Sequence, residues 1–453
     1  MTNSNRELVL TAFMLPAGYY KDSWRMTGSQ SEALGSLELA KYVAELCEAA
    51  CLDAVFIGDI PSAQATVLKG DIMMAPFYEP ITTLSALAAL TSNIGLIGTM
   101  STTYSTPFNA ARQLSGLDTL SGGRAGWNIV TSWAGSANFG ISELASPEER
   151  YRRANEFVET AIELWDSWSD DAVTNDKAAG VWADPSLIRT IHHAGEFFSV
   201  TGPLPMRRSP QGRPLLVQAG SSSDGMDLGS RFADLIYTAQ PDRAKAIDFY
   251  SAYKRQVAEA GRAPGDVKIL PGLVPLVAET DSEARELEKE LASHINYDVG
   301  RRALEGVLNL DLTGVELDDA IPTDRFGEPP ALRSRYEIFR TRALDDRASV
   351  RDLIIENHRS FGHIWAVGSA ATVADKMIDW FEGEACDGFS LNAPFMPGGL
   401  ERICSLLVPE LQNRGYFKSE YRGSTLREHL GLSRPGAWDA AAAHVTPSGD
   451  QLP

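Results

Sequence analysis

The chain has little positive charge and no long apolar run. Its 453 residues include 41 basic and 60 acidic side chains, which gives a formal net charge of −19. Because binding to phosphate backbones needs a basic surface, a nucleic-acid partner is not expected. No stretch approaches the ~18 apolar residues of a membrane span, and no charged segment at the N-terminus leads into an apolar run. We therefore expect a cytoplasmic protein that does not bind a membrane.

Cysteine is also scarce, and the four present do not have the pattern of a metal site. Cys47 and Cys51 are spaced i,i+4 on an expected helix without a His or Cys cluster, and Cys386 and Cys404 follow far along the chain. A structural zinc site needs about four convergent ligands. Free cysteines are usually buried. We therefore predict four buried free thiols and no metal site.

What the chain does contain is a series of short apolar runs that alternate with amphipathic helical segments. This alternation is typical of a parallel sheet wrapped by helices, and continuous apolar runs are expected where both faces of a strand are buried. An α/β barrel with insertions reaches this chain length as one unit. We predict the α/β class and a (β/α)8 TIM barrel. The eight runs cover residues 8–15, 54–59, 95–102, 125–131, 215–220, 235–240, 268–278 and 388–392.

Three segments are not simple connections between a strand and a helix. Residues 169–214 predict a short extended excursion. Residues 280–365, between the seventh and eighth runs, form a long polar insertion, and connections of this length often act as lids. From residue 433 onward the low hydrophobic content predicts disorder. The expected organisation is a barrel over 1–432, with the insertion at about 280–365 as the candidate lid, and a disordered tail over 433–453.

In a (β/α)8 barrel the site lies at the carboxyl ends of the strands, because that rim collects the eight loops. For each polar residue at these ends, the alternative to a role in binding is a satisfied hydrogen bond within a loop. No Ser-His-Asp set is formed by the spacing, so no catalytic side chain is assigned. The polar residues are Asp59, Ser101, Thr102, Thr103, Asn128, Thr131, Gly220, Ser221, Ser222, Ser223, Gln240 and Asn392.

The turn GSSSDG at 220–225 is the most informative part of this rim. A buried strand runs into a small, hydroxyl-rich turn that a helix follows. Backbone N–H groups and serine hydroxyls at such a turn make a site for a phosphate. The alternative, in which the serines only cap the helix, fits the spacing equally well. Neither GxxxxGK[ST] nor GxGxxG occurs, so a P-loop and a dinucleotide-binding Rossmann unit are not indicated.

Aromatic and methionine side chains crowd the predicted rim, although about half of them are expected to belong to the core. Such a rim suits a planar ring system and an apolar substrate. His363 lies where the insertion returns to the barrel, whereas His192 and His193 are expected to brace the excursion. The rim set is Phe13, Trp24, Phe56, Met73, Met74, Phe77, Tyr104, Trp133, Tyr237, His363, Trp365 and Phe395. From it, the substrate pocket is predicted to use Phe13, Phe56, Tyr104, Trp133, Tyr237, His363 and Trp365.

Several longer motifs carry a family resemblance. DAVFIGD ends the second run, WNIVTS lies in the fourth, ERYRRANEFVETAIELW forms the helix after it, and QAGSSSDG follows the fifth. With these motifs the chain resembles the flavin-dependent monooxygenases typified by nitrilotriacetate, pristinamycin and dibenzothiophene-sulfone monooxygenases, a branch of the bacterial luciferase-like superfamily. The resemblance covers residues 8 to about 432 and is weakest across 280–360.

The resemblance implies a barrel that binds reduced FMN, uses O2 as co-substrate and assembles as a homodimer or homotetramer. Matched position by position, Asp59, Thr103 and Asn128 would contact the flavin. Tyr151, Ser221 and Ser222 would hold its phosphate, which agrees with the phosphate site indicated by the serine turn itself. Because no nicotinamide-binding motif is present, we expect a separate NAD(P)H:FMN reductase to supply the reduced flavin.

The substrate and two alternative functions follow from the same observations. An aromatic rim with few basic residues favours a small apolar, aromatic or heteroatom-bearing substrate over a polyanionic chelator. One alternative is an F420-dependent oxidoreductase of the same superfamily, which transfers a hydride and needs no oxygen. The other is a non-catalytic protein that stores or carries FMN. Oxygen uptake with reduced FMN and substrate would distinguish a monooxygenase from the F420-dependent oxidoreductase. A substrate-dependent product would distinguish it from the flavin carrier.

Overall fold

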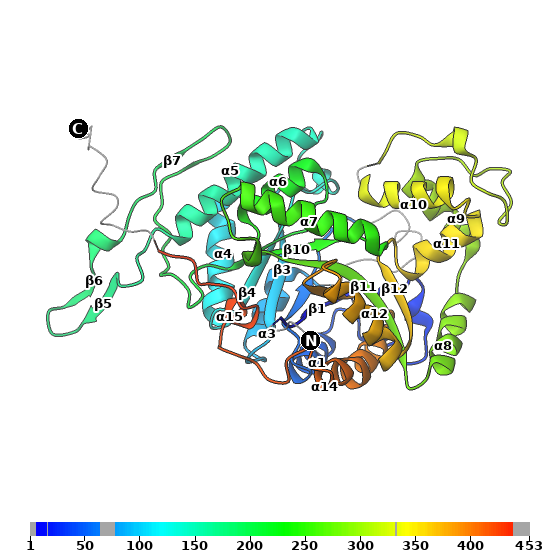
Figure 1. Ribbon diagram of the computed structural model, residues 1–453. Helices are drawn as coiled ribbons and strands as arrows, with labels where there is room; N and C mark the ends of the chain where they lie inside the picture. Colours follow the sequence, from blue (N-terminus) through cyan, green and yellow to red (C-terminus); the bar gives the residue numbers. More distant parts are fainter. Residues whose placement is uncertain (1–5, 16, 64–77, 331–332, 438–453) are drawn as a thin grey trace.

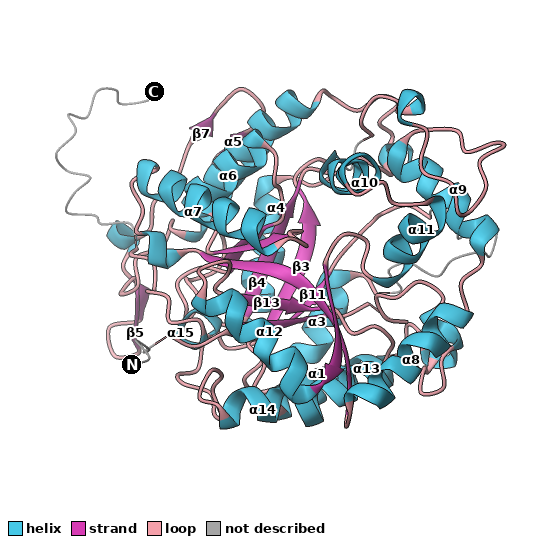
Figure 2. Cartoon of the chain, turned by 45° about the vertical axis from the view of Figure 1, so that its right-hand side comes forward, coloured by secondary structure: helices cyan, strands magenta, loops and turns pink. Residues whose placement is uncertain are grey.

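A computed structural model describes residues 6–15, 17–63, 78–330 and 333–437. Eight parallel strands close into a barrel with helices around it (Figures 1 and 2). Each of the eight apolar runs contains one strand, so the predicted (β/α)8 barrel is confirmed. Around the barrel the strands are β1 (Val9–Phe13), β2 (Ala54–Ile57), β3 (Gly95–Ser101), β4 (Ala125–Val130), β9 (Leu215–Gln218), β10 (Leu235–Thr238), β11 (Lys268–Ala278) and β13 (Gly388–Leu391). β13 pairs with β1 and completes the ring.

The helices that wrap the barrel begin where the sequence supplies caps. Ser146 accepts a hydrogen bond from the Glu149 N–H, with Pro147 in the first turn, and Ser369 accepts one from Thr372. The helices outside the insertion are α1 (Leu37–Ala49), α3 (Pro80–Ala88), α4 (Pro107–Leu120), α5 (Pro147–Trp165), α6 (Ser223–Phe232), α7 (Arg243–Glu259), α12 (Ala370–Glu382), α13 (Gly398–Arg402), α14 (Val408–Asn413) and α15 (Leu426–His429). None of the helices in the described part of the chain is long and apolar enough to cross a membrane.

The barrel interior is closed at the end where the strands begin. Leu426, Leu430 and Leu432 from the α15 segment join the inward-facing side chains of the strands in one buried cluster. Leu426 donates its N–H to the Gly123 carbonyl just before β4, and its side chain fills the space that a Cβ on Gly95 would occupy. Since α15 plugs this end, a site inside the barrel has to lie at the opposite, carboxyl end of the strands.

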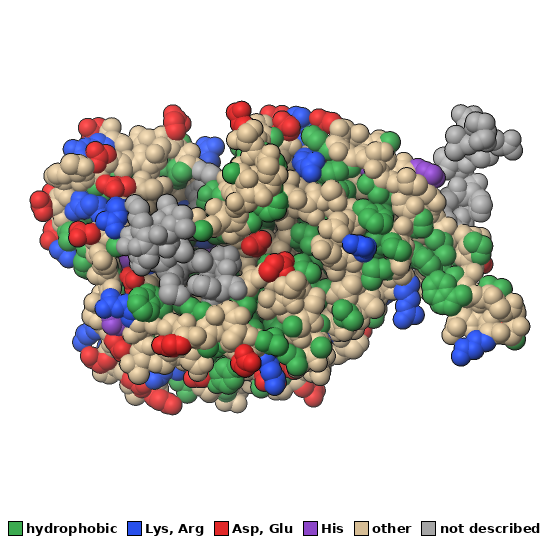
Figure 3. All heavy atoms as spheres, turned by 180° about the vertical axis from the view of Figure 1, so that it is seen from behind, with side chains coloured by type: hydrophobic (Ala, Val, Ile, Leu, Met, Phe, Trp, Pro, Cys, Tyr) green, Lys and Arg blue, Asp and Glu red, His purple; other side chains and the backbone are tan. Residues whose placement is uncertain are grey.

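The insertion between β11 and β13 folds into a helical lobe beside the barrel (Figure 1). The lobe has its own apolar core, to which Tyr20, Met26 and Phe395 from outside the insertion also contribute. Charged side chains of both signs gather over it on the face seen in Figure 3. Its helices are α8 (Asp281–Ser293), α9 (Tyr297–Leu308), α10 (Arg333–Asp345) and α11 (Val350–Arg359).

A ninth strand, β12 (Ile364–Ser369), was not predicted. β11 is eleven residues long, and only its first half belongs to the barrel. Its second half, from Leu273 to Ala278, leaves the barrel and pairs in parallel with β12. The insertion therefore returns to the barrel through a strand of its own. The prediction missed this strand because its residues alternate between buried and half-buried instead of forming a continuous buried run, and because it runs directly into the cap of α12.

The excursion at 169–214 consists of two antiparallel pairs, β5 (Val173–Asp176) with β6 (Val181–Ala183) and β7 (His193–Ala194) with β8 (Ser199–Val200). Figure 1 shows both on the side of the barrel away from the lobe. Both ring nitrogens of His193 form hydrogen bonds with carboxylates of α5, Nδ1 with Glu163 and Nε2 with Glu156, each at 3.2 Å. It braces the excursion against α5, as the sequence predicted, whereas no such contact of the His192 side chain is seen among the described residues.

The thiols and the C-terminal segment differ in part from expectation. Cys47, Cys386 and Cys404 are buried free thiols, but Cys51 is only half-buried because it lies beyond the end of α1, with a φ of 60°. No group of three or more His, Cys, Asp or Glu side chains among the described residues is placed to hold a metal ion. At the start of the predicted tail, Arg434 pairs with Asp170 at 2.6 Å. Residues 438–453 lie outside the described part, so disorder there stays a prediction.

Candidate active site

The residues predicted to hold a flavin lie along one arc of the carboxyl rim. Asp59 follows β2, Thr103 follows β3, Asn128 lies near the end of β4, and Ser221 and Ser222 follow β9. These four strands are consecutive neighbours in the barrel and all parallel. The register pairs Thr99 with Asn128 and Asn128 with Val217. The barrel thus brings Asp59 and Ser222, 163 positions apart in the sequence, to one side of its mouth.

Asn128 points into the barrel, because its neighbours Trp127 and Ile129 pack outward against the helices. It is 4% exposed, and its Nδ2 donates to Thr99 Oγ1 at 2.9 Å. Its Oδ1 has no hydrogen-bond partner among the described residues. A buried acceptor without a donor costs about 1–3 kcal/mol. The side chain is therefore suited to a ligand that presents an N–H group, and the ring system of a flavin carries such a group.

Asp59 follows β2 and Thr103 follows β3, the two strands that precede β4 and its Asn128 in the barrel. Asp59 is half-buried, and burial together with the nearby Glu79 carboxylate raises its pKa above the ordinary value. The Thr103 N–H donates to Ser101 Oγ at 3.1 Å, and the Ser132 hydroxyl donates to the same oxygen at 2.7 Å. These bonds fix the loops after β3 and β4 to each other at the rim.

The turn after β9 is joined by Tyr151 from α5. A Cβ atom on Gly220 or on Gly225 would lie 3.1 Å from the Tyr151 hydroxyl, and on Gly220 it would also lie 2.3 Å from Gln218 Nε2. Glycine is therefore needed at both positions for the close approach. Ser222 accepts a hydrogen bond of 3.2 Å from the Gly225 N–H and so caps α6, while Ser221 is exposed beside it. Ser222 therefore caps the helix. The exposed serine hydroxyls and the N–H groups at the start of this ten-residue helix can in addition donate hydrogen bonds to an anion.

Three of the predicted pocket aromatics form a stack inside the barrel. Phe13 stacks on Phe56 and Phe56 on Tyr237, both with ring centroids 4.8 Å apart. The Tyr237 hydroxyl donates to Thr11 Oγ1 at 3.1 Å. Tyr19, which the prediction did not include, extends the group with its ring 6.4 Å from Phe13. The stack spans the barrel interior from β1 and β2 to β10, which are the strands at or next to the two ends of the predicted flavin arc.

The other predicted pocket residues lie elsewhere. Tyr104 stacks on Phe139 at 4.2 Å and donates to the Ala134 carbonyl, in the loops after β3 and β4. Trp133 is 40% exposed. Trp365 lies on β12, donates to Glu288 and packs on the lobe core, so the structure does not bring it to the stack. Of the wider rim set, Trp24 is exposed, Phe395 belongs to the lobe core, and Met73, Met74 and Phe77 lie outside the described residues.

His363 does reach the barrel mouth, and it brings Arg335 with it. The imidazole lies against β11, where a Cβ on Gly272 would collide with it, and its edge meets the ring of Tyr19 at 5.3 Å. Arg335 from α10 donates to His363 Nε2 at 2.7 Å. Burial, and then the adjacent guanidinium, hold the pKa of His363 well below its usual range. The ring is therefore neutral, with Nε2 as the acceptor and the proton on Nδ1.

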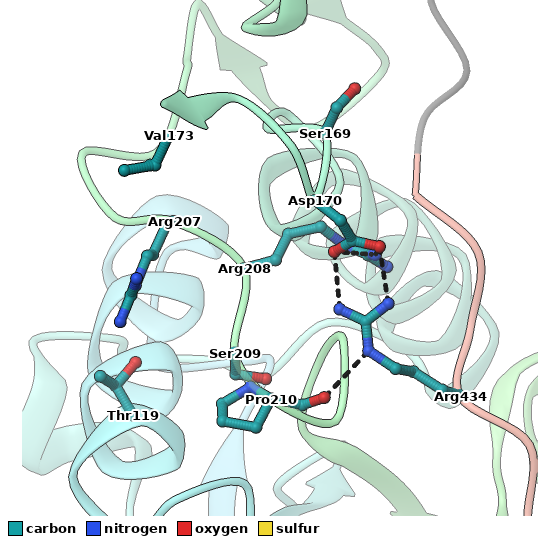
Figure 4. Close-up of a pocket in the computed structure, with 9 residues that line it drawn as sticks. All are labelled: Thr119, Ser169, Asp170, Val173, Arg207, Arg208, Ser209, Pro210 and Arg434. Carbon is teal, nitrogen blue, oxygen red and sulfur yellow. Dashed lines mark hydrogen bonds and ion pairs between the residues drawn. The ribbon is translucent and has the colours of Figure 1, made fainter. Parts of the chain in front are cut away.

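A polar hollow of about 350 Å³ lies at the other end of the barrel, near the start of β9 (Figure 4). Arg208 pairs there with Asp166 and Asp170, and Arg434 pairs with Asp170 through two nitrogens. The charges that line it are largely paired with each other. They tie the C-terminal segment to the excursion, which is a structural role, and the hollow is separated from the mouth by the filled barrel.

The closed barrel, with one end plugged by α15 and polar side chains along its carboxyl rim, defines a (β/α)8 protein with a candidate ligand site at that rim. The chain belongs to the luciferase-like monooxygenases, whose family model matches residues 20–385. It is 41% identical to the N-acetyl-S-(2-succino)cysteine monooxygenase of Bacillus subtilis (strain 168), over 96% of this chain and 99% of that protein. It is 37% identical to nitrilotriacetate monooxygenase component A of Aminobacter aminovorans, over 95% and 98%. The resemblance indicated by the motifs is thereby confirmed.

A solved structure of similar shape contains a flavin. It is a riboflavin lyase with a modified FMN and the substrate riboflavin, and it superposes with a TM-score of 0.82 and 28% identity. The match covers 98% of this chain and all of that one.

Proposed function

We propose that this chain is the oxygenase component of a two-component system, which uses reduced FMN and O2 to oxygenate a small organic substrate. The observation that carries the proposal is the convergence of the Tyr151 hydroxyl on the Gly220–Gly225 turn, on the same rim as Asn128. The names of the relatives, a monooxygenase and a monooxygenase component A, support the reaction class. The flavin in the riboflavin lyase supports the choice of cofactor.

In this proposal the phosphate of FMN binds at the turn after β9. Ser221, Ser222 and Tyr151 offer hydroxyl groups there, and the amino end of α6 adds the N–H groups and the favourable dipole that an anion needs. The ring lies along the arc of Asp59, Thr103 and Asn128. Asn128 Oδ1, which lacks a donor, accepts the N–H of the ring.

Bound in its reduced form, FMN supplies the activation of O2, so the chain itself needs no catalytic acid or nucleophile. The protein orients the ring, excludes water and admits the substrate. The stack of Phe13, Phe56 and Tyr237 provides the apolar wall against which the reacting part of the substrate lies. We propose that the lobe at about 280–365 covers this mouth.

The reduced flavin comes, in our proposal, from a separate NAD(P)H:FMN reductase, because the sequence offers no nicotinamide-binding motif. We further propose that the chain works as a homodimer or homotetramer. We retain the F420-dependent oxidoreductase and the flavin carrier only as outcomes that the experiment below separates.

The test combines the purified chain with FMN, NADH and a panel of small organic compounds, with and without an FMN reductase. We expect oxygen uptake and an oxygenated product only when the reductase is present. Efficient NADH consumption by the chain and FMN alone would contradict the separate reductase. Oxidation of reduced F420 without oxygen would favour the hydride-transfer alternative, and tight FMN binding without any product would favour the carrier.

A further inference from the structure

The hollow shown in Figure 4 is bordered by an alternating chain of ion pairs. In order, the chain consists of Arg213, Asp166, Arg208, Asp170 and Arg434, with nitrogen-to-oxygen distances of 3.0, 2.9, 3.0 and 2.6 Å. Three arginines therefore share two carboxylates, and one positive charge is left over. Hydrogen bonds from Arg434, and then the charge of Arg208, lower the pKa of Asp170 to about 2, so this count holds at neutral pH.

Arg207 adds a second positive charge. Its side chain is exposed and lines the hollow, and in Figure 4 it lies across the hollow from Arg434. It has neither a hydrogen bond nor an ion pair with any residue in the part of the chain that the structure describes. Among the described residues that line the hollow, Asp170 is the one carboxylate, and the neighbouring Asp171 does not line it. The hollow therefore carries an excess of two positive charges.

This local charge contrasts with the formal net charge of −19 of the whole chain. A concave site lined by charge of one sign concentrates ions of the opposite sign. Arg208, which is 9% exposed, also has a buried Nε without a hydrogen-bond partner among the described residues. A buried donor is costly to leave without an acceptor. Both observations indicate that the hollow suits an anion.

The size and the lining of the hollow indicate which kind of anion fits. Its volume of about 350 Å³ lies at the lower end of the range for small-molecule sites. Its lining is mostly polar, with hydroxyl groups from Thr119, Ser169 and Ser209 beside the arginines. The planar fork of an arginine matches the oxygens of a phosphate and donates two parallel hydrogen bonds to them. A phosphate group fits these features better than an apolar acid does.

We propose that this hollow binds a phosphate group, either of a small phosphate ester or of inorganic phosphate, with Arg207 as the main donor. A phosphate monoester carries about −1.5 to −2 charges near neutral pH, which matches the excess of two positive charges. Arg208 and Arg434 contribute their charge while they stay paired with Asp170. A bound phosphate would strengthen the link between the C-terminal segment and the excursion. The inference goes beyond the proposed function and does not depend on it, because α15 plugs the barrel at this end.

The test titrates the flavin-free chain with three probes at neutral pH and constant ionic strength, by calorimetry and by thermal shift. The probes are methyl phosphate, inorganic phosphate and dimethyl phosphate, which carries a single charge. We expect methyl phosphate and inorganic phosphate to bind saturably and to raise Tm, and dimethyl phosphate to bind about tenfold more weakly. Tighter binding of methyl phosphate would support a phosphate ester as the natural ligand, and tighter binding of inorganic phosphate would support the free ion.

Arg207→Gln should weaken the binding of methyl phosphate by about tenfold or more, the usual effect of a lost hydrogen bond to a charged group. Because Arg207 has no hydrogen bond or ion pair with another described residue, the variant should fold with an unchanged Tm in the absence of ligand. Arg333→Gln is the matched control, since it makes the same change of charge on α10, where the side chain is 76% exposed. It should bind the probes as the wild type does.

Ser221→Ala separates this site from the proposed site of the flavin phosphate, and it should leave the binding that depends on Arg207 unchanged. The inference is overturned if dimethyl phosphate binds as tightly as methyl phosphate, if no probe binds saturably at tens of millimolar, or if Arg207→Gln binds like the wild type. A loss of binding in Ser221→Ala alone would place the probe at the rim, which overturns the inference and leaves the proposed function standing. A failure of FMN to bind at the rim would count against the proposed function and leave the Arg207 result intact.

Discussion

The hydroxyl of Tyr151 lies against Gly220, so closely that a Cβ on the glycine would be 3.1 Å from the phenolic oxygen. The tyrosine comes from α5 and the glycine from the turn after β9, and their contact shapes a narrow cradle of backbone and hydroxyl groups. Gly225, at the start of α6, completes the cradle from the other side. The cradle accounts for glycine at two positions that lie 69 and 74 residues beyond the tyrosine.

Gly225→Ala should weaken the binding of reduced FMN by about tenfold, equivalent to about 1.4 kcal/mol. The added methyl would lie 3.0 Å from the Gly220 Cα and 3.1 Å from the Tyr151 hydroxyl, so the turn has to shift. Anaerobic titration followed by protein fluorescence gives the affinity. Gly116→Ala is the control, because no atom lies within 4 Å of a Cβ there, and its affinity should be unchanged. Equal affinities of the two variants would count against the cradle.

Ser221→Ala and Ser222→Ala should separate binding from capping. Ser222 caps α6, so its replacement should lower the free energy of unfolding by about 1 kcal/mol as well as the affinity for FMN. Ser221→Ala should lower only the affinity. Neither change should affect riboflavin, which has no phosphate. A loss of riboflavin affinity as large as the loss of FMN affinity would exclude the assignment of these serines to the phosphate.

Asn128→Leu should weaken FMN and riboflavin alike, by about tenfold, because the side chain would meet the ring that both ligands share. The unfolding free energy of the flavin-free protein should change little, since the substitution removes a buried acceptor without a donor but also the hydrogen bond to Thr99. Urea unfolding and the anaerobic titration check the two parts. An unchanged affinity for both flavins would place the ring elsewhere.

These predictions differ in how far the sequence alone supports them. The strands were predictable because both faces of each are buried, which leaves a continuous apolar run. Asn128 and the serine turn were predictable because they belong to local motifs at strand ends. Arg335 was not, because α10 carries four arginines with no local feature that distinguishes one of them. Its contact with His363 depends on how the lobe packs against the barrel.

Trp365 is a residue that the sequence placed in the substrate pocket but that the structure places against the lobe core. Its position in the sequence, two residues after His363, suggested that both side chains enter the pocket. The His363 ring lies against Gly272, whereas the pairing of β12 with the part of β11 outside the barrel turns Trp365 toward Glu288 and the lobe core. Only the pairing of β12, which the sequence did not predict, decides this.

Asp118 should make stability depend on pH. The carboxyl is fully buried, and burial raises its pKa to about 6, although it accepts hydrogen bonds from Gln211 and Ala125. Between about pH 4 and 6 the unfolded chain has released this proton and the folded chain keeps it. The free energy of unfolding should therefore fall by about 3 kcal/mol as the pH rises through this window.

Asp118→Asn removes the titrating group, so this part of the fall should be absent from the variant. Urea unfolding of both proteins across the window measures the difference. If the wild type and the variant lose the same free energy as the pH rises, Asp118 ionises with an ordinary pKa and the argument from its burial is wrong.

The proposed function depends on where the flavin phosphate binds, and a crystal structure of the chain with bound FMN measures that position directly. We expect the phosphate within hydrogen-bond distance of Ser221, Ser222 and Tyr151, and the ring beside Asn128. A phosphate at the opposite end of the barrel, among the arginines of the hollow near Arg208, would contradict the account.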